Sequence, residues 1–268
     1  MSDISNLVKA RLNEIPSSMI RRVNEKYSKI DDIIKLTVGE PDFDTPDHIK
    51  LAAIKSILNN RSHYAPNRGT GELRTSISDY LARRSELNYS PESQIIVTNG
   101  ATEAISTAIN GIVRENDVVL IPSPAFSLYE TLTLQNGGQP VSINTEPTGF
   151  KLTPDLLQSY LDKYVDRVKL VVLNYPNNPT GVTYTPTEIQ GLADVLKQYQ
   201  VAILSDEVYS ELSYDVEHVS IAKLLPDQVL YVNSVSKSYA MTGWRVGYLC
   251  GPEPTITCLL YTSPSPRD

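Results

Sequence analysis

Cysteine is scarce in this sequence of 268 residues, which contains only Cys250 and Cys258. Two cysteines cannot form the disulfide framework on which small secreted domains depend, so the composition favours a reducing compartment. Long apolar runs are also missing, and no stretch is long enough to span a bilayer. The first residues, MSDISNLVKARLNEIP, are charged and have no apolar signal core. We therefore expect a cytoplasmic protein with no membrane partner.

An excess of positive charge is missing as well. Lys and Arg number 24 against 31 Asp and Glu, which gives a formal net charge of -7 at pH 7. This balance argues against nucleic acid as a partner. The chain is 41% hydrophobic and 21% charged, as in ordinary globular proteins, and its length suits one large domain or one and a part. No metal site is expected.

A repeated Thr-Pro pair marks the starts of three expected helices. Thr45-Pro46, Thr153-Pro154 and Thr185-Pro186 each place an N-cap residue before a proline in the first turn. Thr185 and Glu188 also have the spacing of a capping box. Apolar residues follow at helical spacing at 157–164 and at 189–196, and another apolar helical face covers 104–112.

Short apolar runs lie between these helices. They are DVVLIP (117–122), VKLVVLNYP (168–176), VAILSDE (201–207) and QVLYVNS (228–234). They do not alternate with polar residues, so both faces of each strand are expected to be buried. Strands alternating with helices predict an α/β fold, with a mostly parallel central sheet and helices on both faces. Ligands in such folds bind beyond the carboxyl ends of the strands.

Two polar motifs follow strands of this kind. In IIVTNGATEAIS the backbone N–H groups of Gly100, Ala101 and Thr102 would open a helix and form an anion site, although the motif taken alone favours a plain tight turn, since glycine turns are common. In NYPNNPTG, Asn178 offers a side-chain amide and precedes a proline that could be cis. Asn-Pro and Pro-Thr-Gly are also ordinary turn formers.

Two further motifs carry charge. Asp206, in SDEVY, follows an apolar strand, where a carboxylate is costly unless it is paired, with Tyr209 three residues later. The alternative role for Asp206 is a helix N-cap. In SVSKSYAMTGWRVGY, Ser234 and Arg245 could hold a phosphate, and Lys237 is either a surface charge or an amine whose pKa is lowered by burial and by nearby cations.

Together the four motifs provide a phosphate site, an aspartate for a ring nitrogen, donors for a ring oxygen and an amine nucleophile. Pyridoxal 5′-phosphate is the common cofactor that needs all four. The motifs GEPDFDTP, YAPNRGTGELR, NYPNNPTG, SDEVY and SKSYAMTGWRVGY also resemble, in order and spacing over about residues 20–254, those of the class I aminotransferases. This family belongs to the fold-type I pyridoxal-phosphate enzymes.

The resemblance implies a role for each of several residues. Lys237 resembles the Schiff-base lysine, and Asp206 resembles the partner of the pyridine nitrogen. Tyr209 and Asn178 resemble the donors to the ring 3-oxygen. The implied catalytic residues are Lys237, Asp206 and Tyr209. Phe126 occupies the position of the aromatic side chain that stacks on the ring. The phosphate ligands would be Gly100, Ala101, Thr102, Ser234 and Arg245. Tyr64 resembles a tyrosine that reaches the neighbouring subunit's phosphate, which implies a homodimer. Gly39 lies in the loop that contacts the substrate carboxylate, and Asn178 and Phe126 are also implied to contact the substrate.

The resemblance also divides the chain. Residues 1–30 are expected to form an N-terminal arm and residues 31–254 the cofactor-binding large domain. Residues 255–268 depart from the family pattern and are expected to be a non-native or truncated tail. The small C-terminal domain of the family, with its carboxylate-binding arginine, would then be largely missing, and this chain would be a fragment with little or no turnover.

The implied reaction is transamination between an L-amino acid and a 2-oxo acid. Another fold-type I reaction, such as that of a C–S β-lyase, uses the same cofactor residues and stays open. A non-catalytic, cofactor-sensing domain of a transcriptional regulator is an alternative of another class, although the first 30 residues are too few for a winged-helix domain. Aromatic amino acids, aspartate and N-acetyl-diaminopimelate all remain candidate substrates.

Overall fold

A seven-stranded sheet forms the centre of the molecule. The computed structural model describes residues 4, 7–15, 19–34 and 38–262. In spatial order β1-β7-β6-β5-β4-β2-β3, all strands are parallel except β7, which runs antiparallel to β1 and β6. The strands are β1 (Ile95–Asn99), β2 (Val118–Ser123), β3 (Gln139–Asn144), β4 (Val168–Asn174), β5 (Ala202–Asp206), β6 (Val229–Ser234) and β7 (Val246–Cys250). The predicted mostly parallel sheet is confirmed.

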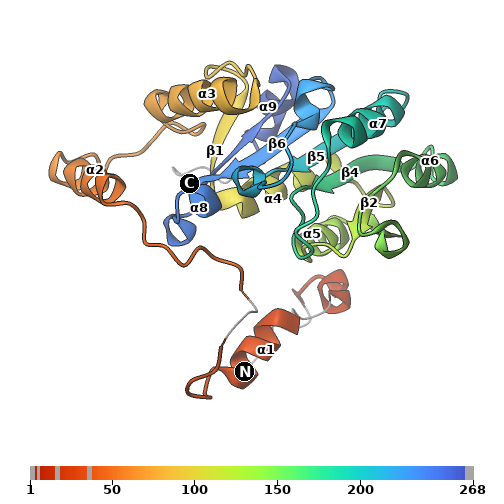
Figure 1. The fold of residues 1–268 in the computed structure, drawn as a ribbon, viewed down its shortest axis with the longest axis horizontal. Coiled ribbons are helices and arrows are strands. Elements are labelled where there is room, and N and C mark those ends of the chain that lie inside the picture. Colours follow the sequence, from red (N-terminus) through yellow and green to blue (C-terminus); the bar gives the residue numbers. More distant parts are fainter. Residues whose placement is uncertain (1–3, 5–6, 16–18, 35–37, 263–268) are drawn as a thin grey trace.

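Helices cover both faces of the sheet, as predicted (Figure 1). One buried cluster joins a sheet face to α3 (Gly71–Ser85), α6 (Pro154–Lys163) and α7 (Pro186–Leu196). The other joins the opposite face to α4 (Gly100–Ile112), α5 (Leu128–Gln135) and α9 (Glu253–Leu259). Strand β4 shows why its sequence is continuously apolar: Val171 belongs to the first cluster and its neighbour Val172 to the second.

Two of the three predicted Thr-Pro helix starts are confirmed. The side chain of Thr153 accepts a hydrogen bond from the backbone of α6, and Thr185 and Glu188 form the complete capping box of α7. The prediction for Thr45 was wrong. Helix α2 (Asp47–Leu58) has Pro46 at its N-cap, because the Thr45 hydroxyl donates to the distant carbonyl of Ala240 at 2.6 Å.

The remaining elements are short or lie at the periphery. Residues 1–30 contain η2 (Ala10–Glu14) and α1 (Met19–Tyr27), which lie apart from the sheet in Figure 1. Single turns occur at η3 (Glu146–Thr148), η4 (Ser210–Leu212), η5 (Ile221–Lys223), α8 (Val235–Ser238) and η6 (Thr242–Trp244). Within the part of the chain that the structure describes, no helix is long and apolar enough to cross a membrane.

The end of the chain is only partly described. Residues 263–268, the last part of the expected tail, lie outside the described residues. Before them, α9 packs on the same face as α4 and buries Ile256 and Leu259. The expected boundary at residue 255 therefore falls inside this helix.

The edge that carries the polar motifs is set by strand direction. The carboxyl ends of the parallel strands β4, β5 and β6 are adjacent, since Asn174 pairs with Asp206 and Asp206 with Val232. Because β7 is antiparallel, its first residues lie at this same edge, where Gly247 pairs with Ser234 and Val246 with Asn99. The reversal brings Arg245, just before β7, to the start of α4.

Candidate active site

The start of α4 forms one end of the site. Gly100 is buried and has a φ of +73°, a left-handed conformation that favours glycine. A Cβ atom at this position would lie 2.3 Å from a guanidinium nitrogen of Arg245, so the arginine lies directly against the first turn. The N–H groups of Gly100, Ala101 and Thr102 have no acceptor within the helix at such an end. With the helix dipole, they are suited to bind an anion.

Arg245 and Ser234 complete this end. Arg245 has a φ of +56°, which is unusual for a residue with a side chain and often occurs at functional sites. Its Nη1 donates to the carbonyl of Thr242 at 2.9 Å, and a guanidinium has further N–H donors for an anion. Ser234 is buried at the end of β6 and caps α8 by accepting from the N–H of Ser236. The edge is therefore rich in donors suited to a phosphate.

Asp206 is a buried carboxyl at the end of β5, with 3% of its surface exposed. Burial raises its pKa to about 6, although hydrogen bonds from the Tyr129 hydroxyl, at 2.6 Å, and from the backbone of Val208 oppose the rise in pKa. No cationic side chain in the described part of the chain forms a salt bridge with it. No helix starts at Asp206 either, so the N-cap alternative is not realised. A buried carboxylate of this kind is suited to a cationic ligand atom.

Asn178 and Tyr209 lie together beside this carboxyl. Their side chains are hydrogen-bonded to each other, while burial raises the pKa of the Tyr209 hydroxyl. The N–H of Asn178 donates to the side-chain oxygen of Asn174 at 2.7 Å, which fixes the turn after β4. The peptide bond between Asn178 and Pro179 is cis, as the sequence suggested. An amide and a phenol side by side can both donate to one ligand oxygen.

Lys237 lies in α8 and is half-buried. Burial lowers the pKa of its amine, the negative charge of Glu40 opposes this shift, and the positive charge of Arg245 adds to it. Its Nζ donates to the carbonyl of Gly39 and lies 5.5 Å from the centre of the Tyr209 ring. A lysine with a lowered pKa has more of the neutral, nucleophilic amine.

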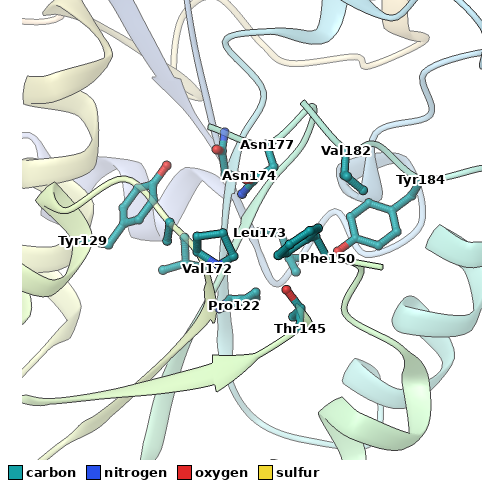
Figure 2. A pocket seen from close by; sticks show the side chains of 12 residues that line it. Pro122, Tyr129, Thr145, Phe150, Val172, Leu173, Asn174, Asn177, Val182 and Tyr184 are labelled. Atoms are coloured by element: carbon teal, nitrogen blue, oxygen red, sulfur yellow. The ribbon is translucent and has the colours of Figure 1, made fainter. Parts of the chain in front are cut away.

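Phe126 follows β2 and is 37% exposed at the same edge. Its ring meets the ring of Tyr129 edge to face, with centroids 5.9 Å apart. Figure 2 shows a small cavity below this edge, with Tyr129 on one side and Phe150 and Tyr184 on the other. Its volume of about 20 Å³ has room for about one water molecule, so a ring ligand would bind at the open edge instead.

The segment around Gly39 crosses the Lys237 loop. Besides the bond from Lys237 to Gly39, the hydroxyl of Thr242 donates to Glu40 at 3.1 Å and the indole of Trp244 donates to Thr45 at 3.2 Å. The structure therefore brings Gly39 to the predicted site through its backbone. Tyr64 is different: its side chain is 74% exposed, and no hydrogen bond joins it to the site within the described residues.

The sequence analysis missed two residues that hold Asp206 in place. Tyr129 is fully buried in α5 and donates to the Asp206 carboxyl, but its spacing from Phe126 is also that of an ordinary core aromatic on a helix. Asn174 donates to the Asp206 carbonyl at 3.0 Å. Asn174 is the first residue of the NYPNNPTG motif and offers a side-chain amide, but the sequence analysis assigned it no role. Its position at a strand end next to the SDEVY strand was the available signal.

The donor set fits pyridoxal 5′-phosphate. Backbone N–H groups and Arg245 suit its phosphate, the unpaired Asp206 carboxyl suits its protonated ring nitrogen, and Asn178 and Tyr209 suit its ring oxygen. Lys237 supplies an amine for its carbonyl carbon. All these groups lie at one edge of the sheet.

The sequence as a whole is similar to known aminotransferases. The family described as "Aminotransferase class I and II" matches residues 31–265, beyond the end at 254 that the motifs indicated. A probable N-acetyl-LL-diaminopimelate aminotransferase of Bacillus subtilis is 43% identical over 93% of this chain, and an aspartate aminotransferase of the same species is 41% identical over 85%. The chain spans 63% and 58% of the lengths of these two relatives.

Solved structures agree with this assignment. The aspartate aminotransferase from Thermus thermophilus with maleate is 34% identical, has a TM-score of 0.90, and matches 98% of this chain and 68% of its own. The aspartate aminotransferase from Rhizobium meliloti is 33% identical with a TM-score of 0.89, over 95% and 65%. On this evidence the chain belongs to the class I and II aminotransferase family.

Proposed function

We propose that this protein is a pyridoxal-phosphate-dependent aminotransferase that transfers an amino group between an L-amino acid and a 2-oxo acid. The observation that carries the proposal is Asp206, a buried carboxyl with no cationic partner in the described chain, at the same sheet edge as Lys237, the pKa of whose amine is lowered by burial. The relatives named above are all aminotransferases, which supports this reaction over a β-lyase or a cofactor sensor.

The first task of the site is to hold the cofactor phosphate. The N–H groups at the start of α4 would donate to the phosphate, and the helix dipole adds partial positive charge at this end. The guanidinium of Arg245, packed against Gly100, can bind the phosphate in a bidentate manner. The hydroxyl of Ser234 has a proton to donate while its oxygen caps α8.

The second task is to control charge around the ring. When bound, the cofactor supplies a ring that accepts electrons from the substrate Cα. The Asp206 carboxylate would hold a proton on the ring nitrogen, and this cation would lower the pKa of Asp206 and so oppose the effect of burial in the free chain. Asn178 and Tyr209 donate to the ring oxygen, and Phe126 covers one face of the ring.

The third task is proton transfer, and Lys237 performs it. Burial lowers the pKa of its amine, so the neutral amine can accept the proton from the substrate Cα and return it during the reaction. The backbone carbonyl of Gly39 and the ring of Tyr209 orient the amine. The same hydrogen bond to Gly39 would place the adjoining loop next to the substrate.

We also propose that the full protein is a cytoplasmic homodimer. Helix α2 buries none of its side chains in this chain, although Leu51, Ile54 and Leu58 recur at helical spacing and are 63%, 52% and 75% exposed. A second subunit would cover this apolar surface and would also give the exposed Tyr64 a phosphate to contact. In this proposal residues 31–254 form the cofactor-binding domain, and residues 1–30 form an arm.

A half-reaction assay tests the proposed reaction. The full protein is loaded with pyridoxal 5′-phosphate and mixed with single L-amino acids such as aspartate, and 2-oxo acid and ammonia are quantified. We expect up to one equivalent of 2-oxo acid per bound cofactor and no ammonia, with the amino acid regenerated when a second 2-oxo acid is added. Release of ammonia in every turnover would contradict transamination and would indicate a lyase.

A further inference from the structure

Glu207, the residue after Asp206, is a buried carboxylate with an unusual number of donors. It has no exposed surface, and its Oε1 accepts from the hydroxyls of Ser205 and Ser220, each at 2.7 Å, and of Tyr175 at 3.3 Å. Its Oε2 lies 2.6 Å from Nε2 of His218. The two serine hydroxyls donate to Oε1, and the His218 tautomer with its proton on Nε2 donates to Oε2, so with this tautomer the group at position 207 accepts on both oxygens.

The donors come from three separate segments. Ser205 belongs to β5, Tyr175 follows β4 directly, and His218 and Ser220 lie in the connection before η5. The Tyr175 ring also stacks on His218 with centroids 5.1 Å apart, and its hydroxyl accepts from the N–H of Ile221 at 2.8 Å. One carboxylate therefore joins the end of β5 to the end of β4 and to the 218–221 connection.

Glu207 and Asp206 lie on opposite faces of the sheet. Successive side chains of an extended strand alternate between faces, so Glu207 points to the same side as Ser205 while Asp206 points toward Tyr129. The segments that Glu207 joins carry the ring-binding groups. Tyr175 precedes the turn that presents Asn178, whereas Tyr209 lies two residues after Glu207.

We infer that Glu207 is a positioning residue for the cofactor ring. By joining the ends of β4 and β5 from behind the sheet, it fixes the separation between the Asp206 carboxyl and the Asn178–Tyr209 pair, which bind different atoms of one rigid ring. The inference rests on the proposed function. Small displacements of such groups have large effects on activity, so a fixed separation matters more here than at an ordinary core position.

The carboxylate is required because of hydrogen-bond polarity. In Glu207→Gln an NH₂ group replaces one carboxylate oxygen, so that one hydrogen-bond donor faces another. Placed toward His218, the NH₂ group finds an acceptor only if the proton of His218 is on Nδ1, which is buried and has no partner among the described residues; placed toward Ser205 and Ser220, it displaces the hydrogen bonds that these hydroxyls donate. The shape of the side chain is preserved while the network loses a bond. Glu211→Gln is the matched control, because Glu211 is also two residues from Tyr209 but accepts from Tyr80 and Arg84 instead of joining the ends of β4 and β5.

The experiment measures pyridoxal 5′-phosphate binding to the 268-residue chain, together with the pH midpoint of the absorption spectrum of the bound cofactor. We expect Glu207→Gln to bind about tenfold more weakly, as for loss of a hydrogen bond to a charged group, and to shift the midpoint. Glu211→Gln should keep the wild-type affinity and midpoint. Urea unfolding of each variant reports stability separately.

Three results would contradict these statements in different ways. If Glu207→Gln keeps the wild-type affinity and midpoint while unfolding at lower urea, Glu207 is only structural and the inference is wrong. If Glu207→Gln does not fold, Ser220→Ala is measured in its place. We expect this variant to bind the cofactor about threefold more weakly, because one hydrogen bond to Glu207 is lost. Wild-type affinity of Ser220→Ala would contradict the inference. If the wild-type chain itself binds no pyridoxal 5′-phosphate, the proposed function falls, and this inference falls with it.

Discussion

At the scale of the residue, Asp206 combines a functional advantage with a structural cost. Its carboxyl is buried and accepts two hydrogen bonds, but no cation of the described chain compensates its charge. Burial therefore raises its pKa from 3.8 to about 6. A bound cationic ring nitrogen would remove this cost, so cofactor binding and the stability of the chain are linked through one residue.

This linkage predicts a pH-dependent effect of Asp206→Asn on the cofactor-free chain. Between about pH 4 and pH 6 the folded state holds a proton that the unfolded state has released, so the wild type loses stability as the pH rises through this window. The isosteric amide carries no charge and avoids the loss. Going from pH 4 to pH 8, Asp206→Asn should gain about 2–3 kcal/mol over wild type in free energy of unfolding.

Urea unfolding at a series of pH values gives this difference, and subtracting the wild-type curve removes the other titrating groups. The same variant should bind pyridoxal 5′-phosphate more weakly, because the partner of the ring nitrogen is lost. A difference in stability that does not change between pH 4 and pH 8 would show that Asp206 is not a buried, unpaired charge.

The residue scale also shows what sequence can and cannot predict. Asp206, Lys237 and Arg245 each stand out because a charged side chain next to a buried strand is rare, and the structure places all three at one edge. Tyr129 could not be predicted in the same way. Its ring packs in the core like any aromatic residue, and only the three-dimensional structure shows that its hydroxyl meets Asp206.

At the scale of the element, local signals predicted what local interactions stabilise. The capping box of Thr185 involves groups three residues apart, so sequence spacing is sufficient to find it. Strand β7 was missed because its first residues lie within a polar motif. Its direction is also opposite to that of both neighbours, β1 and β6, and β1 is distant in the sequence. Strand β3 was missed because it lies at the sheet edge, alternates in burial and contains Pro140.

Thr45 and Thr185, two of the three threonines that precede prolines, should respond differently to substitution. Thr185→Ala removes a helix cap and should lower the free energy of unfolding by about 1 kcal/mol without changing cofactor affinity. Thr45→Ala removes no cap, but it breaks the bonds from Thr45 to Ala240 and from Trp244 to Thr45 that hold the Lys237 loop.

Thr45→Ala should therefore weaken pyridoxal 5′-phosphate binding more than it lowers stability, and Thr185→Ala should do the reverse. Urea unfolding and a cofactor titration of the same two variants measure both quantities. The account of the 39–45 segment would be wrong if both substitutions changed stability and affinity in the same proportion.

At the scale of the whole molecule, α2 indicates assembly. Leu51, Ile54 and Leu58 are exposed, none of its residues is buried in the described chain, and it projects at the margin of the fold in Figure 1. Ile54→Lys should therefore shift the chain toward a monomer, because a charge on the covered face would have to be desolvated. Sedimentation velocity over a range of protein concentrations measures the shift.

Lys55→Gln provides the control on the same helix, since Lys55 is a polar, exposed neighbour of the apolar stripe. Its oligomeric state should match that of the wild type. If Ile54→Lys and Lys55→Gln sediment alike, the apolar side chains of α2 are not an interface between subunits.

The identity of the amine that binds the cofactor tests the account most directly. Pyridoxal 5′-phosphate is added to the chain, the complex is reduced with borohydride, and the labelled peptide is identified by mass spectrometry. We expect the label on Lys237, because burial lowers the pKa of its amine at the edge that also carries Asp206 and the start of α4. The label should also be lost in Lys237→Arg. Stoichiometric label on any other lysine would contradict the assignment of this edge as the active site.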